Sequence, residues 1–295
     1  MDVSVIIVNY NTKELTLDCV NSLFTHTSGV EFEVIIVDNA STDDSPAWFE
    51  VDNRVTFIRS HENIGFGRAN NLGYQHASGK YIFLLNSDTL LLNNALKLFF
   101  DKMESASSDI GCLGCLLQGA DHQYVHSYAD FPKVSDTLYT YVFPQLFGLF
   151  GFHNMKMDDP DRRKADPSFF EVDYVTGADL FIRRTAIETC GLFDPDFFMY
   201  YEDPELQHRY RVNGYRSFIY DAPQIVHLEG CSSDSGNQRK KELMKMGSMM
   251  TYLSKTEACW KVFLLKLLLL LKSPYTLLRY KYSLEDSLSY LKKIV

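Results

Sequence analysis

The sequence predicts an α/β protein with a mostly parallel, doubly wound sheet flanked by helices, followed by a C-terminal helical appendage. Three observations support this prediction. Short apolar runs alternate with helical stretches through the first hundred residues, which is typical of consecutive βα units with right-handed crossovers. Polar side chains follow three of these runs, where the strands are expected to end. After residue 236 the pattern changes to basic and leucine-rich helices.

The predicted elements follow in order along the chain. Val3–Val8 is a continuous apolar run, which suits a strand buried on both faces, and a helical stretch from Thr12 to about Phe24 follows it. Pro46 lies in the first turn of the next short helix, a position that tolerates its missing N–H. Further strands are predicted at residues 33–37, 55–59, 81–85, 174–176, 180–183, 217–220 and 224–227, and further helices at 43–51, 67–78, 91–103 and 204–213.

Charge is unevenly distributed in this chain, whose net charge is −9. The segment from Arg239 to the end has 12 Lys and Arg against 4 Asp and Glu, a net charge of +8. Residues 1–238 carry 17 basic against 34 acidic side chains, a net charge of −17. Because an acidic body repels phosphates, we expect no nucleic-acid partner. The 46% hydrophobic content excludes a disordered or collagen-like chain.

The N-terminus lacks the features of a signal peptide, because no basic region or small-residue cleavage site accompanies its first apolar run. The apolar stretch 258–271 would be roughly 21 Å long as a helix, short of a ~30 Å hydrocarbon core. Lys261 and Lys266 interrupt it, so we expect no membrane span. Cys112 and Cys115 have metal-like spacing without a second pair, which favours reduced thiols in a cytoplasmic protein.

No glycine-rich phosphate loop of a familiar type is present. Gly65 and Gly67 follow a predicted strand and precede a helix, but Asn70 stands where a dinucleotide fingerprint has its third glycine. The first βα turn has no glycine at all. These features exclude a nicotinamide or flavin Rossmann site and a P-loop.

Asp38 follows the second predicted strand, and the sequence around it leaves two interpretations open. A carboxylate at a strand end caps the following turn or helix in many proteins. Alternatively, Asp38 accepts a hydrogen bond from an imide N–H, a group that uracil and thymine offer and adenine does not.

Asp88 lies just beyond the fourth predicted strand, in the sequence Asn86-Ser-Asp88. It either caps the next helix or serves as a hard oxygen ligand for Mg²⁺ or Mn²⁺ bridging a diphosphate. With one carboxylate where two are common, such a site needs another protein ligand. His227 closes a later apolar strand and is either a structural residue or that missing imidazole ligand.

Glu202 and Asp203 are adjacent acids placed just before a predicted helix. Acids in a first helical turn favour the helix dipole, which explains many such pairs. The functional alternative makes one carboxylate a general base that deprotonates a hydroxyl nucleophile.

Taken together, these segments resemble the inverting, nucleotide-sugar-dependent glycosyltransferases of family 2, which have the GT-A fold. The resemblance covers roughly residues 1–230 and is closest to bacterial rhamnosyltransferase-type members. The order and spacing of its motifs together are highly specific. The matching residues are 5–11, 37–43, 63–73, 79–88, 177–178, 193–194 and 201–203, with Arg209 and Gly214.

The resemblance implies a role for each matching polar residue. Asp88 and His227 would bind a divalent metal, Mg²⁺ or Mn²⁺, while Asp203 would be the base and Glu202 would orient it or the acceptor. Asn9 and Asp38 would hold the pyrimidine nucleoside. The full set assigned to the nucleotide-sugar is Asn9, Asn11, Asp38, Asn63, Gly65, Arg68, Asn71 and Asn86.

The implied reaction is transfer of a single sugar, with inversion, from a UDP- or dTDP-sugar to a hydroxyl of a glycan or lipid-linked acceptor. dTDP-rhamnose is one candidate donor, and cell-surface polysaccharide synthesis the implied context. The chain lacks the Gln-x-x-Arg-Trp element of processive synthases, which favours single addition. A sugar-nucleotide-forming nucleotidyltransferase and a non-catalytic sugar-nucleotide-binding scaffold are the alternatives.

The expected organisation is a GT-A nucleotide-sugar transferase domain at 1–236, divided into a nucleotide-binding half (1–110) and an acceptor half (111–236), and a basic helical tail at 237–295. The irregular aromatic stretch 124–152 is core, lines the acceptor side or touches lipid. The tail would lie on an anionic membrane surface, pack on the domain or form a dimer contact. We therefore expect a cytoplasmic protein, peripheral on the inner face of the membrane if the tail binds lipid.

Overall fold

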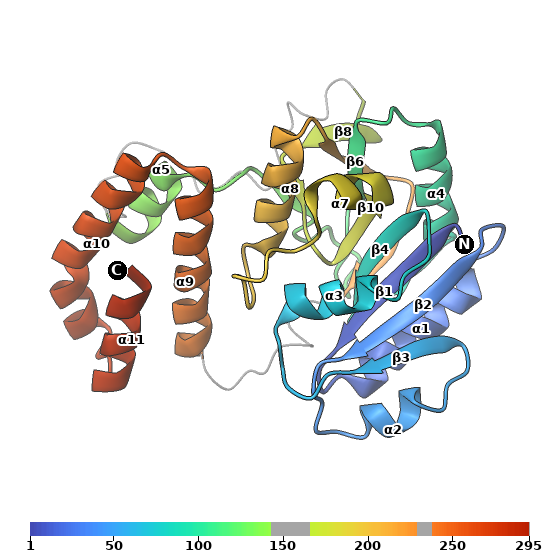
Figure 1. Cartoon of the computed structure of the whole chain (residues 1–295), viewed down its shortest axis with the longest axis horizontal. Coiled ribbons are helices and arrows are strands. Elements are labelled where there is room, and N and C mark those ends of the chain that lie inside the picture. Colours follow the sequence, from blue (N-terminus) through green and yellow to red (C-terminus); the bar gives the residue numbers. More distant parts are fainter. Residues whose placement is uncertain (143–165, 229–237, 295) are drawn as a thin grey trace.

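The computed structural model describes residues 1–142, 166–228 and 238–294. Figure 1 shows a twisted central sheet with helices on its faces, and a separate group of C-terminal helices beside it. Within the described residues the large sheet has eight strands in the order β3-β2-β1-β4-β10-β6-β11-β8. They are β1 (Val3–Asn9), β2 (Phe32–Asp38), β3 (Val55–Arg59), β4 (Tyr81–Asn86), β6 (Ile110–Gly114), β8 (Phe169–Val172), β10 (Asp179–Arg183) and β11 (Arg216–Tyr220).

The predicted parallel half of the sheet is confirmed. Strands β3, β2, β1 and β4 are neighbours and all run in the same direction. Their central residues are buried on both faces, as continuous apolar runs require. One face packs against α1 (Lys13–His26), α2 (Ser45–Phe49) and α4 (Ala95–Ser105), and the other against α3 (Phe66–Tyr74), α7 (Arg184–Cys190) and α8 (Glu202–Val212).

The second half of the sheet is mixed in direction. Strand β10 runs antiparallel to both β4 and β6, β11 is parallel to β6, and β8 is an antiparallel edge. β6, β8 and α7 were not predicted from the sequence. β6 reads Ile-Gly-Cys-Leu-Gly, with two glycines that weaken any strand signal, and only its place in the interior of the sheet makes it a strand.

The helix predicted at 91–103 is wrong at its start. Residues Thr89–Leu91 form strand β5, which pairs antiparallel with β12 (Ile225–His227), and the helix α4 begins at Ala95. The strand conformation of residues 89–91 depends on a partner strand more than a hundred residues away in the sequence. Local periodicity therefore could not predict it. A second small pair joins β7 (Tyr128–Ala129) to β9 (Tyr174–Val175).

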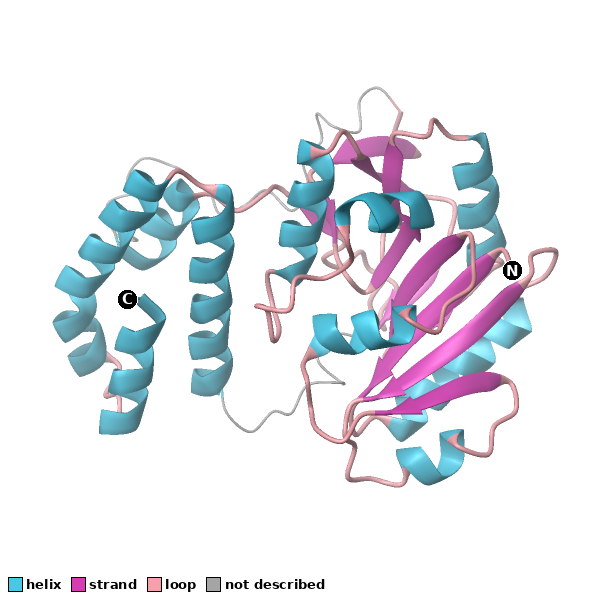
Figure 2. Cartoon of the chain, viewed as in Figure 1, coloured by secondary structure: helices cyan, strands magenta, loops and turns pink. Residues whose placement is uncertain are grey.

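The basic tail is helical, as predicted. It consists of α9 (Gln238–Thr256), α10 (Cys259–Arg279) and α11 (Leu284–Ile294), which Figure 2 shows as a group of their own. Together with α5 (Val134–Thr137) and η1 (Leu138–Val142) they enclose a hydrophobic core of their own, to which Phe197 also belongs. The domain boundary predicted at 236 and the aromatic residues at 143–152 lie outside the described residues.

No helix in the described part of the chain is long and apolar enough to cross a membrane. Five of the six cysteines lie in that part, and all five are free. Cys112 and Cys115 are both buried, and their thiols have raised pKa values because burial disfavours the thiolate.

Candidate active site

The ends of strands β1 and β2 are joined by the side chains of Asn9 and Asp38. Asn9 Nδ2 donates to Asp38 Oδ1 (2.8 Å) and to Ser41 Oγ (3.0 Å). The hydroxyls of Thr12 and Thr16 donate to Asn9 Oδ1. Every hydrogen-bonding group of this amide is therefore used within the protein, and the side chain is fully buried. This geometry gives Asn9 a positioning role toward Asp38, where the resemblance implied direct nucleotide contact.

Asp38 is buried and already accepts two hydrogen bonds. Besides Asn9, the backbone N–H of Ser41 donates to its Oδ2 (3.1 Å). This is the turn-capping arrangement that the sequence left open. A carboxylate has about four lone-pair positions, so two remain for a further donor such as an imide N–H.

Asn11 ties the first βα turn to the loop after β2. It adopts the left-handed conformation (φ 55°), which Asn tolerates better than most residues. Its Oδ1 accepts from the backbone N–H of Thr42 (2.7 Å) and of Asp43 (3.3 Å). The predicted nucleotide residue Asn11 thus shapes the loop that begins at Asp38.

Asn39 and Asn63 link the end of β2 to the loop that follows β3. Asn39 Nδ2 donates to Asn63 Oδ1 (3.0 Å), and Asn39 Oδ1 accepts from Ile64 N (2.9 Å). Asn63 Oδ1 also accepts from Gly65 N (3.0 Å). Asn39 was not among the predicted site residues. Its position directly after Asp38 is the signal that could have identified it.

Gly65 packs against the backbone of the segment 193–198. Its φ of +87° favours glycine, and a Cβ there would lie 2.3 Å from the carbonyl oxygen of Phe198. The next residue, Phe66, donates its backbone N–H to that same oxygen (3.0 Å). Glycine at position 65 therefore allows the two loops to touch.

Arg68 and Asn71 fasten the same segment to α3. Arg68 Nε donates to the carbonyl of Pro195 (2.8 Å). The Asn71 amide makes two bonds to the Phe193 backbone, donating to its carbonyl (2.7 Å) and accepting from its N–H (3.0 Å). In this structure both predicted nucleotide residues hold the segment that leads into the paired acids.

Three polar groups meet beyond the end of β4. His227 Nε2 lies 3.3 Å from Asp88 Oδ1 and 3.4 Å from Asn86 Nδ2. Asp88 is only 1% exposed. The small sheet formed by β5 and β12 brings His227 opposite Thr89, and the Leu228 N–H donates to the Asp88 carbonyl (2.9 Å). The structure therefore brings together the residues predicted as metal ligands.

These residues fit a partial divalent-metal site. A buried carboxylate and an imidazole offer two ligands, and magnesium is commonly held by one or two carboxylates with substrate phosphates completing its shell. Among the described residues there is no group of three or more His, Cys, Asp and Glu that could hold a metal by themselves. The remaining ligands would therefore come from a bound diphosphate.

Asp179 is a buried acid beside this group that the sequence analysis did not select. It begins β10 opposite Leu85 of β4, and its Oδ2 accepts from Cys115 N (2.6 Å). Burial raises its pKa to about 7, while the hydrogen bond from Cys115 and the charge of His227 act in the opposite direction. An acid inside an otherwise apolar strand, directly after Gly177-Ala178, is the signal that could have found it.

The paired acids Glu202 and Asp203 open helix α8. Tyr200 and Tyr201, just before them, both have positive φ (71° and 66°), a strained arrangement that often accompanies functional sites. The backbone N–H of Gly177 donates to Asp203 Oδ2 (2.9 Å). A Cβ at position 177 would lie 2.5 Å from Asp203 Oδ1, so glycine permits this approach.

The acids are linked to the group formed by Asn86, Asp88 and His227 through one residue of backbone. Gly177 holds Asp203, and the carbonyl of the next residue, Ala178, accepts from Asn86 N (3.0 Å). Burial raises the pKa of both Glu202 and Asp203. The negative charge of Asp203 raises the pKa of Glu202 further, so Glu202 keeps its proton to higher pH than Asp203 does.

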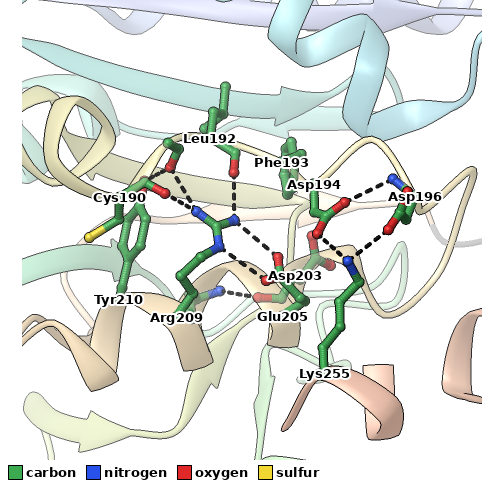
Figure 3. Close-up of polar contacts among 12 residues, drawn as sticks. Cys190, Leu192, Phe193, Asp194, Asp196, Asp203, Glu205, Arg209, Tyr210 and Lys255 are labelled. Atoms are coloured by element: carbon green, nitrogen blue, oxygen red, sulfur yellow. Dashed lines mark hydrogen bonds and ion pairs between the residues drawn. The ribbon is translucent and has the colours of Figure 1, made fainter. Parts of the chain in front are cut away.

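A network on α8 holds the loop that precedes the acids (Figure 3). Arg209 forms a two-pronged ion pair with Glu205 through Nε and Nη2 (3.0 Å each). The same guanidinium donates to the carbonyls of Cys190 and Leu192. At the other end of the loop, Lys255 of α9 bridges Asp194 (2.8 Å) and Asp196 (2.7 Å).

The fold and the site together define the class of protein. The parallel half-sheet with polar residues at its strand ends, followed by an antiparallel strand and an acid pair on a later helix, is the arrangement of a GT-A fold. The family model described as "Glycosyl transferase family 2" matches residues 4–177, so the chain belongs to glycosyl transferase family 2.

Two curated relatives illustrate the similarity. Glycosyltransferase GlyG of Streptococcus pneumoniae is 30% identical over 112 residues, which cover 37% of each chain. The low-salt glycan biosynthesis hexosyltransferase Agl10 of Haloferax volcanii is 27% identical over 221 residues, covering 71% of this chain and 62% of Agl10. The matched region thus spans less than two thirds of either relative.

Solved structures share the fold at low sequence identity. S. aureus TarS (residues 1–349) in complex with UDP-GlcNAc superimposes with a TM-score of 0.58 at 18% identity, covering 99% of this chain and 79% of TarS. Mannosyltransferase PcManGT from Pyrobaculum calidifontis, in complex with GDP-Man and Mn²⁺, has a TM-score of 0.58 at 15% identity, covering 97% and 77%.

Proposed function

We propose that this chain is an inverting glycosyltransferase that moves one sugar from a UDP- or dTDP-sugar to an acceptor hydroxyl, with dTDP-rhamnose as one candidate donor. The observation that carries the proposal is the placement of Asp203. Its Oδ2 is fixed by Gly177 N (2.9 Å), and one residue along the backbone Ala178 is bonded to Asn86 of the metal group. A base is thereby joined to the place where a diphosphate leaving group would be held.

Asp203 is suited to accept a proton. Among the described residues its Oδ1 has no hydrogen-bond partner, and burial raises its pKa, which makes the ionised form a stronger base. The acceptor hydroxyl gives its proton to Oδ1 while its oxygen bonds to the anomeric carbon. The bond from that carbon to the diphosphate oxygen breaks on the opposite face, and the configuration inverts.

Glu202 serves a different purpose from its neighbour. It is 5% exposed, and burial together with the charge of Asp203 raises its pKa. A neutral Glu202 keeps the negative charge on Asp203 and can donate a hydrogen bond to the acceptor. Glu202 therefore orients the reacting groups.

Asp88 and His227 would hold a Mg²⁺ or Mn²⁺ ion, with Asn86 beside them. When bound, such an ion neutralises the charge that develops on the leaving diphosphate. The names of related structures support this role, since PcManGT was obtained with GDP-Man and Mn²⁺. The buried Asp88–His227 pair supplies the ligand types that the ion requires.

The pyrimidine would be recognised by Asp38, which Asn9 and Asn11 hold in place. The loop joined by Asn39 and Asn63, with Gly65, would close the nucleotide site from the side of β3. Arg68 and Asn71 support the segment 193–198, which joins this nucleotide-binding half (1–110) to the acceptor half (111–236). UDP-GlcNAc in the TarS complex supports a nucleotide-sugar donor.

The acceptor is proposed to be a glycan or a lipid-linked glycan in cell-surface polysaccharide synthesis. Names of relatives support this context, among them a hexosyltransferase of glycan biosynthesis and a poly(ribitol-phosphate) beta-glucosyltransferase from Bacillus spizizenii. The proposed location is cytoplasmic, with peripheral attachment to the inner face of the membrane.

Two alternatives make different predictions. A nucleotidyltransferase would need a glycine-rich basic loop after β1, where this chain has Asn11-Thr12-Lys13. A binding scaffold would keep nucleotide affinity without turnover. The second alternative is therefore separated from a transferase by measuring binding and transfer on the same variants.

The test is a thermal-shift panel of UDP-, dTDP- and GDP-linked nucleotides with and without Mn²⁺, followed by transfer assays with the donor that binds. Asp88→Ala should abolish the metal-dependent shift, whereas Asp101→Ala, on the exposed side of α4, should retain it. Asp203→Asn should retain the shift and lower kcat about 10²–10⁴-fold. Full transfer by Asp203→Asn would show that Asp203 is not the base. No thermal shift with any nucleotide would indicate that the chain does not use a nucleotide-sugar.

A further inference from the structure

Helix α10 presents an apolar face to solvent along its whole length. Trp260, Phe263 and Leu271 are 67%, 69% and 71% exposed, and Leu278 near the C-terminal end is 80% exposed. Spacings of three and four residues place them on one side of the helix. The complete set is Trp260, Phe263, Leu264, Leu267, Leu271, Tyr275 and Leu278, which we call the outer face.

The opposite side of α10 is already used for packing. Val262, Leu265, Leu269 and Ser273 are buried in the hydrophobic core that α10 shares with α9 and α11. These positions have the same helical spacing but lie on the side of the helix opposite the outer face. The helix is therefore apolar on both sides, and among the described residues only one side is packed in a hydrophobic core.

Basic side chains accompany the outer face. Arg279 and Lys281 follow its C-terminal end, are exposed, and form no ion pair with any described carboxylate. The segment 239–295, to which α10 belongs, has a net charge of +8. The outer face therefore belongs to a cationic tail, in a chain whose body is acidic.

We propose that the outer face of α10 lies in the interface of an anionic lipid membrane, parallel to its surface. Apolar and aromatic side chains on one side with cations around them are the features that bind such a surface. Trp260 and Tyr275 have apolar rings with a polar tip, which suit the headgroup level. Arg279 and Lys281 would contact lipid phosphates.

A second copy of this chain fits the same face less well. A two-fold interface between outer faces would bring together two tails that each have a net charge of +8. Such like-charge contacts oppose association, whereas an anionic lipid surface neutralises them. Charge complementarity therefore favours anionic lipid over a second copy as the partner of the outer face.

The membrane would be held in a defined relation to the paired acids. The tail is joined to the segment before Glu202 by Lys255, by the bond from Ser248 Oγ to the Met199 carbonyl (2.8 Å), and by Phe197, which is buried in the tail core. With the proposed lipid-carried acceptor, the enzyme and its acceptor would lie on the same membrane. That consequence rests on the proposed function, whereas lipid binding itself does not.

The two tryptophans of the chain give a direct test. Trp48 lies in α2 and Trp260 on the outer face, so Trp48→Phe leaves Trp260 as the only indole. With phosphatidylglycerol vesicles, its emission should shift to the blue and be quenched by brominated lipid acyl chains. The matched Trp260→Phe variant retains Trp48 and should show neither change.

Co-sedimentation with vesicles measures the binding itself. The variant Phe263→Ser/Leu267→Ser/Leu271→Ser should lower partition into phosphatidylglycerol vesicles about tenfold or more, and Arg279→Ala/Lys281→Ala should do the same. The control Val51→Ser/Val212→Ser changes two equally exposed residues of the body and should bind like the native chain. Phosphatidylcholine vesicles should bind weakly.

Three results would overturn the proposal. They are no binding of the full chain to anionic vesicles, unchanged binding of the outer-face variant, and a native dimer that this variant converts to monomer without affecting lipid binding. The last result, read by light scattering, would assign the face to a second copy. No assay here uses a sugar donor, so failure of lipid binding and failure of the proposed transfer are separate observations.

Discussion

At the scale of single residues, the most unusual feature is a pair of adjacent acids at the start of α8, one buried and one half-buried. Glu202 is nearly inaccessible and Asp203 is fixed by one backbone N–H. Burying carboxyl groups with few partners is unfavourable for the folded state, and two strained tyrosines precede them. We interpret this arrangement as stability given up for the proposed base.

Glu202→Gln should therefore stabilise the protein at neutral pH. Because the folded pKa of Glu202 is raised, the unfolded chain releases its proton first, and stability falls as pH rises from about 4.5 toward the folded pKa. The substitution removes this loss, so we expect a gain of about 1–3 kcal/mol at pH 8 and little change near pH 4. Thermal unfolding at both pH values measures it.

The exposed residue Glu188 provides the control. Glu188→Gln should leave the melting temperature unchanged at both pH values. An equal gain at pH 4 and pH 8 for Glu202→Gln would show that the effect is not one of protonation, and would contradict the raised pKa.

Gly177→Ala tests the close approach of backbone and base. The added Cβ would lie 2.5 Å from Asp203 Oδ1, so the carboxylate must move. We expect kcat to fall about 10–100-fold, with the fold retained, since small displacements of catalytic groups are costly. Gly247→Ala in α9 is the control, because its new Cβ meets only the flexible Lys293 side chain. Normal kcat for Gly177→Ala would exclude this glycine from positioning the base.

At the scale of elements, helix α8 is tied to the preceding loop mainly through Arg209. Its guanidinium binds Glu205 and the carbonyls of residues 190–192, which fixes the start of the loop that ends at the acids (Figure 3). Both Glu205 and most of Arg209 are shielded from solvent. Such a fork of hydrogen bonds requires a planar guanidinium.

Arg209→Lys should therefore cost about 1–3 kcal/mol of unfolding free energy, since an ammonium cannot satisfy Glu205 and the three carbonyls together. Arg211→Lys is the control on the same helix. Arg211 is more exposed and pairs with Glu171 and Asp173, so its loss should be under about 1 kcal/mol. Urea unfolding of both variants compares them, and equal losses would argue against a special role for Arg209.

The elements also show how far local pattern determines structure. Val3–Val8 and the strands near residues 33–37, 55–59 and 81–85 were predicted because each is an apolar run with its own turn signals. β6 and β8 carry glycines or charges and become strands through their neighbours. Leu91 was predicted to begin a helix, but residues 89–91 pair with β12, since main-chain hydrogen bonds to that strand outweigh local preference.

At the scale of the whole molecule, the chain has a GT-A body and a helical tail with its own hydrophobic core. The two are connected by Phe197 and by contacts of α9 with α8. Leu265 is fully buried in the tail core, whereas Leu271 on the same helix is 71% exposed. Substituting each of these two leucines therefore separates the effect of core packing from the effect of a surface position within one helix.

Leu265→Ala should destabilise the protein by about 2–5 kcal/mol, because it leaves a cavity in the tail core. Leu271→Ala should change stability by less than about 0.5 kcal/mol. Chemical unfolding followed by both tryptophans, one in the body and one in the tail, would also show whether the two parts unfold together. A small loss for Leu265→Ala would mean that the tail core contributes little.

The sequence by itself determined the parallel half of the sheet, the helical tail, the charge division and the type of chemistry, because apolar periodicity, charge and motif order are local properties of the chain. It also selected Asp38, Asp88, Asp203 and His227. Only the tertiary structure decided that Asn9 is saturated by protein partners, that Asp179 lies buried near His227, and that α10 exposes one apolar face. Each of these depends on contacts between residues far apart in the sequence, which no local pattern encodes.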